Sequence, residues 1–168
     1  MGKNLMQFFR ERRSLPKNLV GIFFDFDGVF TNNKVTVDEE GKESVNCNRA
    51  DGLGVRMLKE MNIPLFILST ETNQVAAKRA KKLALEIYYG IEDKKDVLIS
   101  LCRKNRFELR NVMFVGNDLN DLEVMKIVGH PAAPRDAHPV IRRIAKYIIA
   151  KNGGDGVVKE IAERLNKR

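Results

Sequence analysis

The chain has 168 residues, of which 43% are hydrophobic and 31% charged, and its formal net charge at pH 7 is +8. This length fits one domain with a proper buried core. No apolar run approaches the roughly 18 residues of a membrane-spanning helix, and no long apolar segment follows the basic N-terminus. We therefore expect neither a membrane protein nor a secretory signal peptide.

The positive charge would suit a polyanionic partner, but basic residues are interleaved with acids along the chain, as in residues 10–13 and 159–164. Solvated helix faces explain this pattern better than nucleic-acid binding does. Cys47 and Cys102 show no metal-ligand spacing, so we prefer free thiols of a cytoplasmic protein to a disulfide.

Residues 1–18 are predicted to be a basic N-terminal appendage, with a short amphipathic helix over residues 5–10 that ends before Pro16. Its preferred role is to cover apolar surface of the main domain. Assembly and connection to a fused domain are the alternatives. Residues 19–168 are predicted to form a single domain without internal repeats.

In that domain, predicted strands alternate with predicted helices. Around Gly41, β-branched residues alternate with polar ones in two short runs, which predicts a hairpin over residues 34–46. Strand–helix alternation implies an α/β fold whose mostly parallel sheet is flanked by helices. The predicted strands are 19–24, 64–69, 87–89, 112–116, 132–133 and 147–149, and the predicted helices are 51–61 (with Leu53, Val55, Leu58 and Met61 as its apolar positions), 73–83, 95–105, 119–128, 137–144 and 156–165.

Two carboxylates, Asp25 and Asp27, follow the first apolar run and directly precede Gly28. Side chains two residues apart share one face of a strand, and where the strand ends one carboxylate can reach a substrate while the other lies beside it. A carboxylate that attacks phosphorus forms an aspartyl-phosphate, and a second, protonatable carboxylate can serve the leaving group. Such a site also needs a divalent cation to screen the anionic oxygens.

Further polar residues follow other predicted strands. Ser69 and Thr70 end the second buried run, Lys94 opens a helix after a turn, and Asp118 and Asp121 follow residues 112–116. Each also has a structural interpretation, since the acids could cap turns or the next helix, Ser69 could end a strand, and Lys94 could be a surface lysine. Open α/β sheets bind ligands at the carboxyl ends of their strands, where these residues are predicted to lie.

This ordered pattern resembles the haloacid dehalogenase-like phosphohydrolases, which have a Rossmann-like fold. The resemblance implies Asp25 as nucleophile, Asp27 as acid/base, Ser69 with Thr70 as phosphate-binding hydroxyls, and Lys94 as the phosphate-neutralising lysine. It also implies Mg²⁺ held by Asp25, the carbonyl of Asp27 and Asp118, with Asp121 orienting these ligands and Asn117 beside them.

No stretch of this chain is long enough for the cap domain of larger family members. Only the hairpin lies between residues 31 and 51, and one helix with one short strand lies between residues 69 and 94. The resemblance to capless members implies that oligomerisation covers the site, with the hairpin or tail of one subunit over its neighbour. A homotetramer is the expected assembly.

Residues 25–31, 49–54, 115–121, 136–139 and 153–156 resemble one subfamily. It contains 3-deoxy-manno-octulosonate 8-phosphate phosphatases, nonulosonate 9-phosphate phosphatases, and a domain found with some acylneuraminate cytidylyltransferases. The matches add Arg49 and Asp51 as candidate substrate-binding residues, with an ion pair and a helix cap as their structural alternative. His138 is expected to be a structural hydrogen-bonding residue.

Residues 69–71, at the end of the second predicted strand, distinguish the octulosonate phosphatases from the nine-carbon enzymes. At the positions of residues 69–71, the octulosonate phosphatases have a sequence like Thr-Gly-Arg, whereas this chain has Glu71 at the third position. Glu71 together with Lys82 resembles the acid–lysine pair of the nine-carbon enzymes. An arginine suits a substrate carboxylate, whereas a glutamate accepts hydrogen bonds from sugar hydroxyls. Asp155 replaces an arginine of the octulosonate enzymes, and Asn117 stands where many relatives have aspartate. An exposed helix-side pair is the alternative for Glu71 and Lys82.

We therefore expect a cytoplasmic, Mg²⁺-dependent phosphomonoesterase that acts on a small-molecule sugar phosphate in nonulosonate (sialic acid) synthesis. The expected substrate is 2-keto-3-deoxy-nononate 9-phosphate or an N-acylneuraminate 9-phosphate. The alternatives are a 3-deoxy-manno-octulosonate 8-phosphate phosphatase, a general sugar-phosphate phosphatase, and a non-catalytic oligomerisation module that works with a cytidylyltransferase. The presence of both motif aspartates, Lys94 and Asp118 favours an enzyme.

Overall fold

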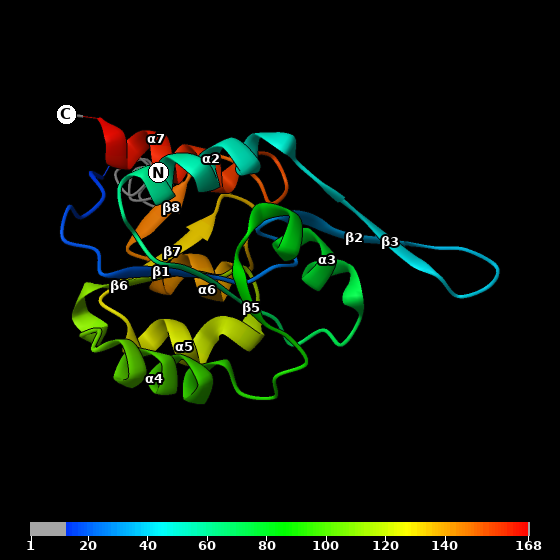
Figure 1. Cartoon of the computed structure of the whole chain (residues 1–168), viewed down its shortest axis with the longest axis horizontal. Coiled ribbons are helices and arrows are strands. Elements are labelled where there is room, and N and C mark those ends of the chain that lie inside the picture. The colour runs from blue at the N-terminus through cyan, green and yellow to red at the C-terminus, as the bar shows by residue number, and fades with distance from the viewer. Residues whose placement is uncertain (1–12, 168) are drawn as a thin grey trace.

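A computed structural model of the chain describes residues 13–167, so the helix expected over residues 5–10 lies outside the described part. At its centre is a six-stranded sheet in the order β5-β4-β1-β6-β7-β8 (Figure 1). Every neighbouring pair in this sheet runs parallel, which confirms the expected sheet. The strands are β1 (Gly21–Phe24), β4 (Leu65–Leu68), β5 (Glu86–Tyr88), β6 (Val112–Val115), β7 (His130–Pro134) and β8 (Tyr147–Ile149).

Helices pack on both faces of the sheet, as Figure 1 shows for α2 and α7 on one side and α4 and α5 on the other. One core cluster joins α2, α3 and α7 to the sheet, and a second joins α4, α5 and α6 to its opposite face. The helices are α2 (Arg49–Glu60), α3 (Gln74–Leu83), α4 (Lys94–Asn105), α5 (Leu122–Ile127), α6 (Pro139–Ile144) and α7 (Val157–Asn166), with 3₁₀ turns η1 (Leu109–Asn111) and η2 (Leu119–Asp121).

Strand β1 shows why the strands of this sheet read as unbroken apolar runs. Ile22 and Phe24 belong to one core cluster, whereas Phe23, between them, belongs to the other and stacks on Phe66 of β4 with 4.6 Å between ring centroids. Because helices cover both faces, successive side chains of a strand are all buried. The last residue of β1 therefore leads directly from the core to the edge where Asp25 lies.

Helix α2 departs from the expected pattern at one position. Leu53 was expected to be an inward apolar residue, but its side chain is 39% exposed. The buried positions of the helix are Asp51, Gly54, Val55 and Leu58. A Cβ atom at Gly54 would lie 2.5 Å from the backbone nitrogen of Lys159, so the backbones of α2 and α7 approach closely there. The inward face thus includes an acid and a glycine, and a search for apolar periodicity does not identify these residues as buried.

The predicted hairpin is present as β2 (Thr31–Val37) and β3 (Glu43–Cys47), which pair antiparallel. It projects from the body of the molecule in Figure 1, and residues 32–37 of β2 are exposed. Asp38 shapes its turn, since its Oδ1 accepts hydrogen bonds from the backbone N–H groups of Glu40 and Lys42. Between residues 31 and 49 the structure contains only this hairpin, and between residues 69 and 94 only α3 and β5, so the expected absence of a cap domain is confirmed.

The described part of the predicted appendage packs on the main domain. Leu15 is 6% exposed and belongs to a core cluster. The backbone carbonyl of Arg13 accepts a 2.7 Å hydrogen bond from Arg164 of α7, and the guanidinium of Arg13 lies 5.5 Å from the ring centroid of Tyr147. Within residues 13–167, no helix combines the length and hydropathy needed to cross a membrane. Both cysteines are free thiols, as expected.

Candidate active site

The carboxyl ends of three neighbouring strands meet at one edge of the sheet. Asp25 follows β1, Ser69 follows β4, and Asn117 and Asp118 come shortly after β6. These strands are adjacent in the order β4-β1-β6, so their ends surround a single cavity. That cavity has a volume of about 300 Å³ and is lined by Asp25, Asp27, Asn33, Ser69, Thr70, Glu71, Asn117, Asp118, Leu119 and Asn120.

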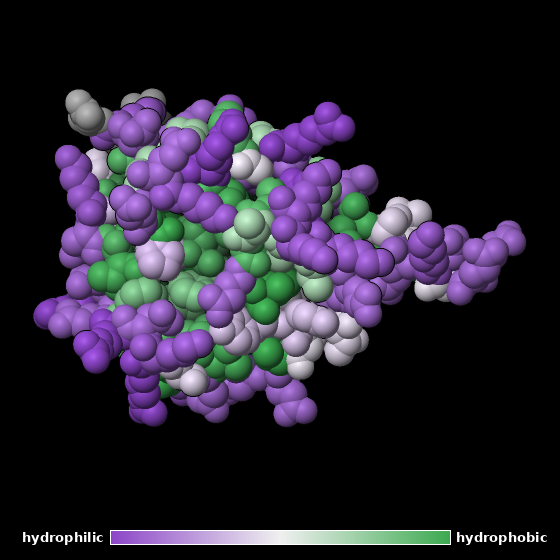
Figure 2. Space-filling model, viewed as in Figure 1, coloured by the Kyte–Doolittle hydropathy of each residue, from purple (hydrophilic) through white to green (hydrophobic). Residues whose placement is uncertain are grey.

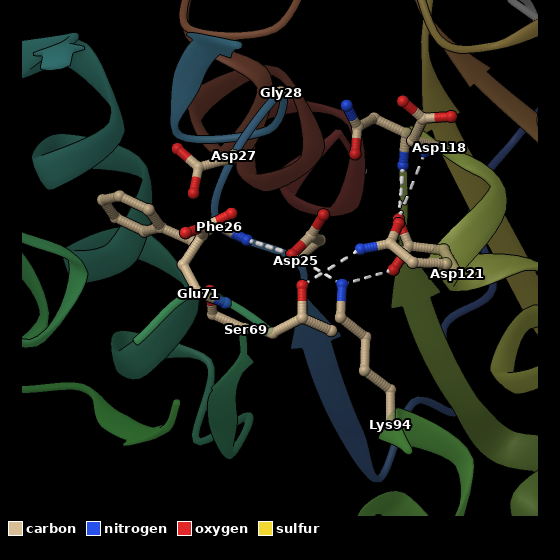
Figure 3. A network of polar contacts seen from close by, with 12 residues as sticks. Asp25, Phe26, Asp27, Gly28, Ser69, Glu71, Lys94, Asp118 and Asp121 are labelled. Carbon is tan, nitrogen blue, oxygen red and sulfur yellow. Dashed lines mark hydrogen bonds and ion pairs between the residues drawn. The ribbon is translucent and has the colours of Figure 1, made fainter. Parts of the chain in front are cut away.

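The carboxylate of Asp25 is held on one side only. Its Oδ1 accepts a 2.8 Å hydrogen bond from the backbone N–H of Phe26 and lies 2.7 Å from Nζ of Lys94 (Figure 3). Burial, together with the carboxylate of Asp121, raises the pKa of Asp25 to about 8, although Lys94 acts in the opposite direction. Within residues 13–167 both of these contacts fall on Oδ1, so Oδ2 is left for a ligand in the cavity.

Lys94 joins Asp25 to the end of β6. Its Nζ lies 2.7 Å from Oδ1 of Asp121, whose Oδ2 accepts a 2.8 Å hydrogen bond from the backbone N–H of Asn117. Gly116 makes room for this acid, since a Cβ atom there would lie 2.6 Å from Cβ of Asp121. Burial alone would lower the pKa of Lys94, but the two carboxylates raise it, so the ammonium stays charged beside the cavity.

Asp27 lies at the tight turn that follows β1. Gly28 has a φ of +82°, which a residue with a side chain rarely adopts. The hydroxyl of Thr31 bonds to two residues of this turn. It donates a 3.1 Å hydrogen bond to Oδ1 of Asp27 and accepts one of 3.2 Å from the backbone N–H of Gly28. Burial raises the pKa of Asp27, the bond from Thr31 lowers it, and the nearby carboxylate of Glu71 raises it further. This carboxyl is therefore suited to carry and return a proton.

A turn near the end of the chain supports the turn that carries Asp27. The backbone N–H of Gly154 donates a 3.0 Å hydrogen bond to the carbonyl of Val29. A Cβ atom at Gly153 would lie 2.3 Å from the carbonyl oxygen of Gly28, so glycine is required for this contact. Oδ1 of Asp136 accepts a 2.9 Å hydrogen bond from the backbone N–H of Gly153 and fixes the turn in place.

Ser69 and Thr70 face the same cavity from the end of β4. Ser69 is 1% exposed, and its Oγ accepts a 3.2 Å hydrogen bond from the backbone N–H of Glu71. Its hydroxyl hydrogen is therefore available to an anionic oxygen in the cavity. Oγ1 of Thr70 accepts a 3.3 Å hydrogen bond from Nδ2 of Asn120, which links the strand ends across the cavity.

The donor set of the cavity fits a hard divalent cation. Asp25 and Asp118 both present carboxylate oxygens, the ligands that Mg²⁺ prefers. Asn117 is 7% exposed, and its Oδ1 is buried without a partner within the described structure. No group of three or more His, Cys, Asp or Glu side chains that could hold a metal ion occurs within residues 13–167. The expected ligand set, two carboxylates with the backbone carbonyl of Asp27, stays a prediction.

Three predicted substrate-binding residues do not line the cavity within one chain. Arg49 is exposed at the start of α2, and Lys82 is exposed in the last turn of α3. Glu71 does line the cavity, but among the described residues no hydrogen bond or ion pair joins Glu71 to Lys82. Asp51 is the third predicted residue that does not line the cavity, and its environment differs from that of Arg49 and Lys82.

Asp51 is fully buried between α2 and α7. Its Oδ1 accepts hydrogen bonds of 2.9 Å and 3.3 Å from the backbone N–H groups of Val158 and Lys159, in the first turn of α7. Burial raises the pKa of Asp51 to about 6, even though these bonds lower it. The structure thus favours the helix-cap interpretation over substrate contact. His138 likewise caps a helix, because its Nδ1 accepts from the backbone N–H of Val140 in α6.

The cavity also includes residues that were not among the predicted site residues. Asn33, Leu119 and Asn120 complete its lining. Asn33 has a φ of 60°, and asparagine tolerates this left-handed conformation better than most residues. The adjacent pair of asparagines after the first motif was the available signal for an unusual turn there.

Comparison with known proteins gave consistent matches. A family model described as haloacid dehalogenase-like hydrolase matches residues 62–161. The 3-deoxy-D-manno-octulosonate 8-phosphate phosphatase of Salmonella typhi is 31% identical over 150 residues, which cover 89% of this chain and 80% of that protein. The corresponding phosphatase of Escherichia coli K12 is 30% identical over the same shares of both chains.

Solved structures agree with these matches. A HAD family hydrolase from Streptomyces avermitilis superposes with a TM-score of 0.88 and 38% identity over 90% of this chain and 88% of its own. The 3-deoxy-D-manno-octulosonate 8-phosphate phosphatase of Moraxella catarrhalis, solved in complex with magnesium, phosphate and KDO, has a TM-score of 0.85 and 30% identity. That match covers 89% of this chain and 86% of the Moraxella protein.

Proposed function

The chain belongs to the haloacid dehalogenase-like hydrolases, and we propose that it is a phosphatase that removes the terminal phosphate of a long α-keto acid sugar phosphate. The observation that carries this proposal is the Asp25 carboxylate. It directly follows β1, is held through Oδ1 by Lys94 and the N–H of Phe26, and lines a cavity that it shares with Asp27, Ser69 and Asp118.

The reaction proceeds in two steps. Oδ2 of Asp25 attacks phosphorus, the P–O bond to the sugar breaks, and Asp27 donates its proton to the departing alkoxide. The product of this step is an aspartyl-phosphate. Asp27, now a carboxylate, then accepts a proton from a water molecule that attacks phosphorus, and inorganic phosphate leaves as the Asp25 carboxylate is restored.

Positive charge and hydrogen-bond donors around the phosphate stabilise the transition state. The hydroxyl of Ser69 and the ammonium of Lys94 would hold its oxygens, whereas the backbone N–H groups of Gly28 and Val29 already donate to Thr31 and Phe26. The cofactor is Mg²⁺, for which Asp25, Asp118 and the carbonyl of Asp27 would be the ligands, and its charge offsets the repulsion between phosphate and carboxylates. Asp121 would act indirectly, because it fixes both Lys94 and the backbone of Asn117.

We propose a nine-carbon nonulosonate 9-phosphate as the substrate. Glu71 supports this choice. It lines the cavity at a position where the octulosonate phosphatases of the family have an arginine, and a carboxylate there accepts hydrogen bonds from sugar hydroxyls. The second candidate is 3-deoxy-manno-octulosonate 8-phosphate. The relatives from Salmonella typhi and Escherichia coli, at 30–31% identity, carry that activity in their names.

The test is phosphate release, with and without Mg²⁺, from three substrates: 2-keto-3-deoxy-nononate 9-phosphate, N-acetylneuraminate 9-phosphate and 3-deoxy-manno-octulosonate 8-phosphate. We expect Mg²⁺-dependent release with the highest kcat/KM for a nine-carbon substrate. A preference for the eight-carbon substrate would overturn the specificity but keep the phosphatase. No release from any of the three would favour the oligomerisation module that works with a cytidylyltransferase.

Four further proposals come from the family resemblance. They are a homotetramer in which the hairpin or tail of one subunit covers its neighbour's site, a cytoplasmic location, a role in nonulosonate synthesis beside an acylneuraminate cytidylyltransferase, and substrate binding by Arg49 and Lys82. The exposure of both side chains is compatible with an intersubunit role. Native mass spectrometry of the full chain tests the tetramer, and Lys82→Gln, assayed by KM for the preferred substrate, tests the lysine.

A further inference from the structure

Two hollows adjoin the catalytic cavity. The first, of about 250 Å³, lies along the hairpin and shares Asp27, Asn33 and Glu71 with the cavity. We call it the hairpin hollow, and its remaining lining residues are Lys34, Val35, Glu43, Val45 and Asn73. The second, of about 240 Å³, shares Asn33, Asn117 and Asp118 with the cavity and is also lined by Gly28, Asp136, Ala137 and His138.

The position of the general acid selects between the two hollows. In the proposed reaction, Asp27 protonates the oxygen that links phosphorus to the sugar, so that oxygen must lie within hydrogen-bonding reach of its carboxyl. The sugar chain beyond this oxygen therefore continues past Asp27. Of the two hollows, only the hairpin hollow is lined by Asp27.

The side chains of the hairpin hollow suit a polyhydroxylated chain with one anionic group. Asp27, Glu43 and Glu71 are acids, and carboxylates accept hydrogen bonds from hydroxyl groups. A ligand carboxylate would be repelled by the carboxylates of Glu43 and Glu71, while Asp27 carries the proton that it donates in the proposed reaction. The cation in this lining is Lys34, an exposed residue of β2, so the anionic end of a ligand is best placed there.

A hydrogen bond fixes one wall of the hollow. Nδ2 of Asn73 donates a 2.9 Å hydrogen bond to Oε2 of Glu43, which ties β3 to the start of α3. Oδ1 of Asn73 simultaneously accepts from the backbone N–H of Val75 and caps α3. Glu43 is therefore held by its Oε2, and its other oxygen can accept a hydrogen bond from a ligand hydroxyl. Figure 2 shows mainly hydrophilic residues along the hairpin, as a sugar-binding surface requires.

We propose that the hairpin hollow holds the sugar chain of the substrate, that Lys34 binds its carboxylate, and that Glu43 accepts hydrogen bonds from its hydroxyls. The inference rests on the proposed function, since it takes the cleaved group to be a long α-keto acid sugar. It assigns substrate recognition to two residues of the hairpin within the same chain, outside the motifs of the catalytic cavity.

The test compares Lys34→Gln with wild type on two substrates. One is the keto acid sugar phosphate that the wild-type enzyme prefers, and the other is sedoheptulose 7-phosphate, a ketose phosphate without a carboxylate. We expect kcat/KM for the keto acid, relative to that for the ketose, to fall about 5- to 10-fold, mainly through KM, as for loss of one partly solvated ion pair. Lys42→Gln, at the turn of the same hairpin and outside the hollow, is the matched control and should leave the ratio unchanged.

Glu43→Gln gives a second, independent readout. Glutamine can still accept from Asn73, but it is a weaker acceptor for hydroxyls than a carboxylate. We expect kcat/KM for both sugar phosphates to fall about 3- to 10-fold relative to kcat/KM for p-nitrophenyl phosphate, which has no sugar chain. Glu39→Gln, on the hairpin turn, is the control for the loss of one negative charge.

The outcomes separate this inference from the proposed function. Sugar-phosphate turnover by wild type, with unchanged ratios in Lys34→Gln and Glu43→Gln, would overturn the hairpin hollow as the sugar site and leave the function standing. Hydrolysis of p-nitrophenyl phosphate alone by wild type would reject the substrate class, and the inference with it. Selective loss in both variants, with unaffected controls, would support the inference.

Discussion

The site at the sheet edge and the hairpin handle charge in opposite ways. Asp25, Lys94 and Asp121 are each at most 5% exposed, and the ammonium of Lys94 pairs with both carboxylates within the fold. On the hairpin, Lys34 and Glu43 are exposed, and Glu43 accepts a hydrogen bond from the uncharged amide of Asn73. Buried charges are costly to unpair, whereas exposed ones contribute little to stability. In our proposals, the core therefore fixes the chemistry, and the hairpin contributes to the choice of substrate.

The largest effect is expected from Asp25→Asn. The amide can still accept hydrogen bonds from Lys94 and Phe26 but cannot attack phosphorus, so kcat should fall at least about 10³-fold. Thermal unfolding followed by circular dichroism should show a folded protein. Activity within about tenfold of wild type would rule out Asp25 as the nucleophile.

Removal of the central cation should cost the most stability. Lys94→Met leaves Asp25 and Asp121 buried without their ion-pair partner, and we expect the free energy of unfolding at pH 7 to drop by about 3–5 kcal/mol. Urea unfolding measures this drop. Lys104→Met, an exposed position on the same helix, should change the value by less than about 0.5 kcal/mol. Equal effects of the two substitutions would contradict a buried charge cluster.

Asp51→Asn should change how stability depends on pH. The pKa of Asp51 is raised from 3.8 to about 6, so the folded state favours the protonated form. Its contribution to stability is complete below pH 3.8 and is lost as the pH rises through about 6. Relative to wild type, Asp51→Asn should therefore gain up to about 3 kcal/mol between pH 4 and pH 7. Urea unfolding across this range measures the gain, with exposed Asp96→Asn as control. A constant difference across the range would disprove the pKa shift.

The smallest effect is expected on the hairpin, where a matched pair of substitutions sharpens the comparison. Val37 is 56% exposed on β2, whereas Val115 is fully buried at the end of β6. Val37→Thr should change the free energy of unfolding by less than about 0.5 kcal/mol, whereas Val115→Thr buries a hydroxyl and should cost about 1–3 kcal/mol. Urea unfolding at one fixed protein concentration measures both. A loss above about 1 kcal/mol for Val37→Thr would show that the hairpin is packed rather than free.

Much of the fold and the cavity could be predicted because their signals are local. Apolar runs that end in polar residues identify the strands, and the order of the strands places Asp25, Ser69 and Asp118 at one edge of the sheet. The hairpin was equally accessible, since β-branched alternation around Gly41 is a short-range pattern. Even the absence of a cap domain follows from counting residues between motifs.

The remaining features depend on contacts between distant residues. Asp51 binds backbone groups of α7 that lie 107 and 108 positions later in the chain, and no pattern near Asp51 reports this. Leu53 was expected inward because it is apolar, but Gly54 faces α7 instead. Lys34 and Glu43 carry no motif. Only the position of the hairpin beside Asp27 gives these two residues a candidate role.

The contact between Gly153 and the carbonyl of Gly28 also has a consequence during synthesis of the protein. The first catalytic motif leaves the ribosome early, but the turn that supports it comes more than a hundred residues later. A nascent chain that has already formed β1, β4 and β6 still lacks this support for the Asp27 turn. Full catalytic competence is thus expected only after Gly153 and Gly154 have left the ribosome and packed against the Asp27 turn.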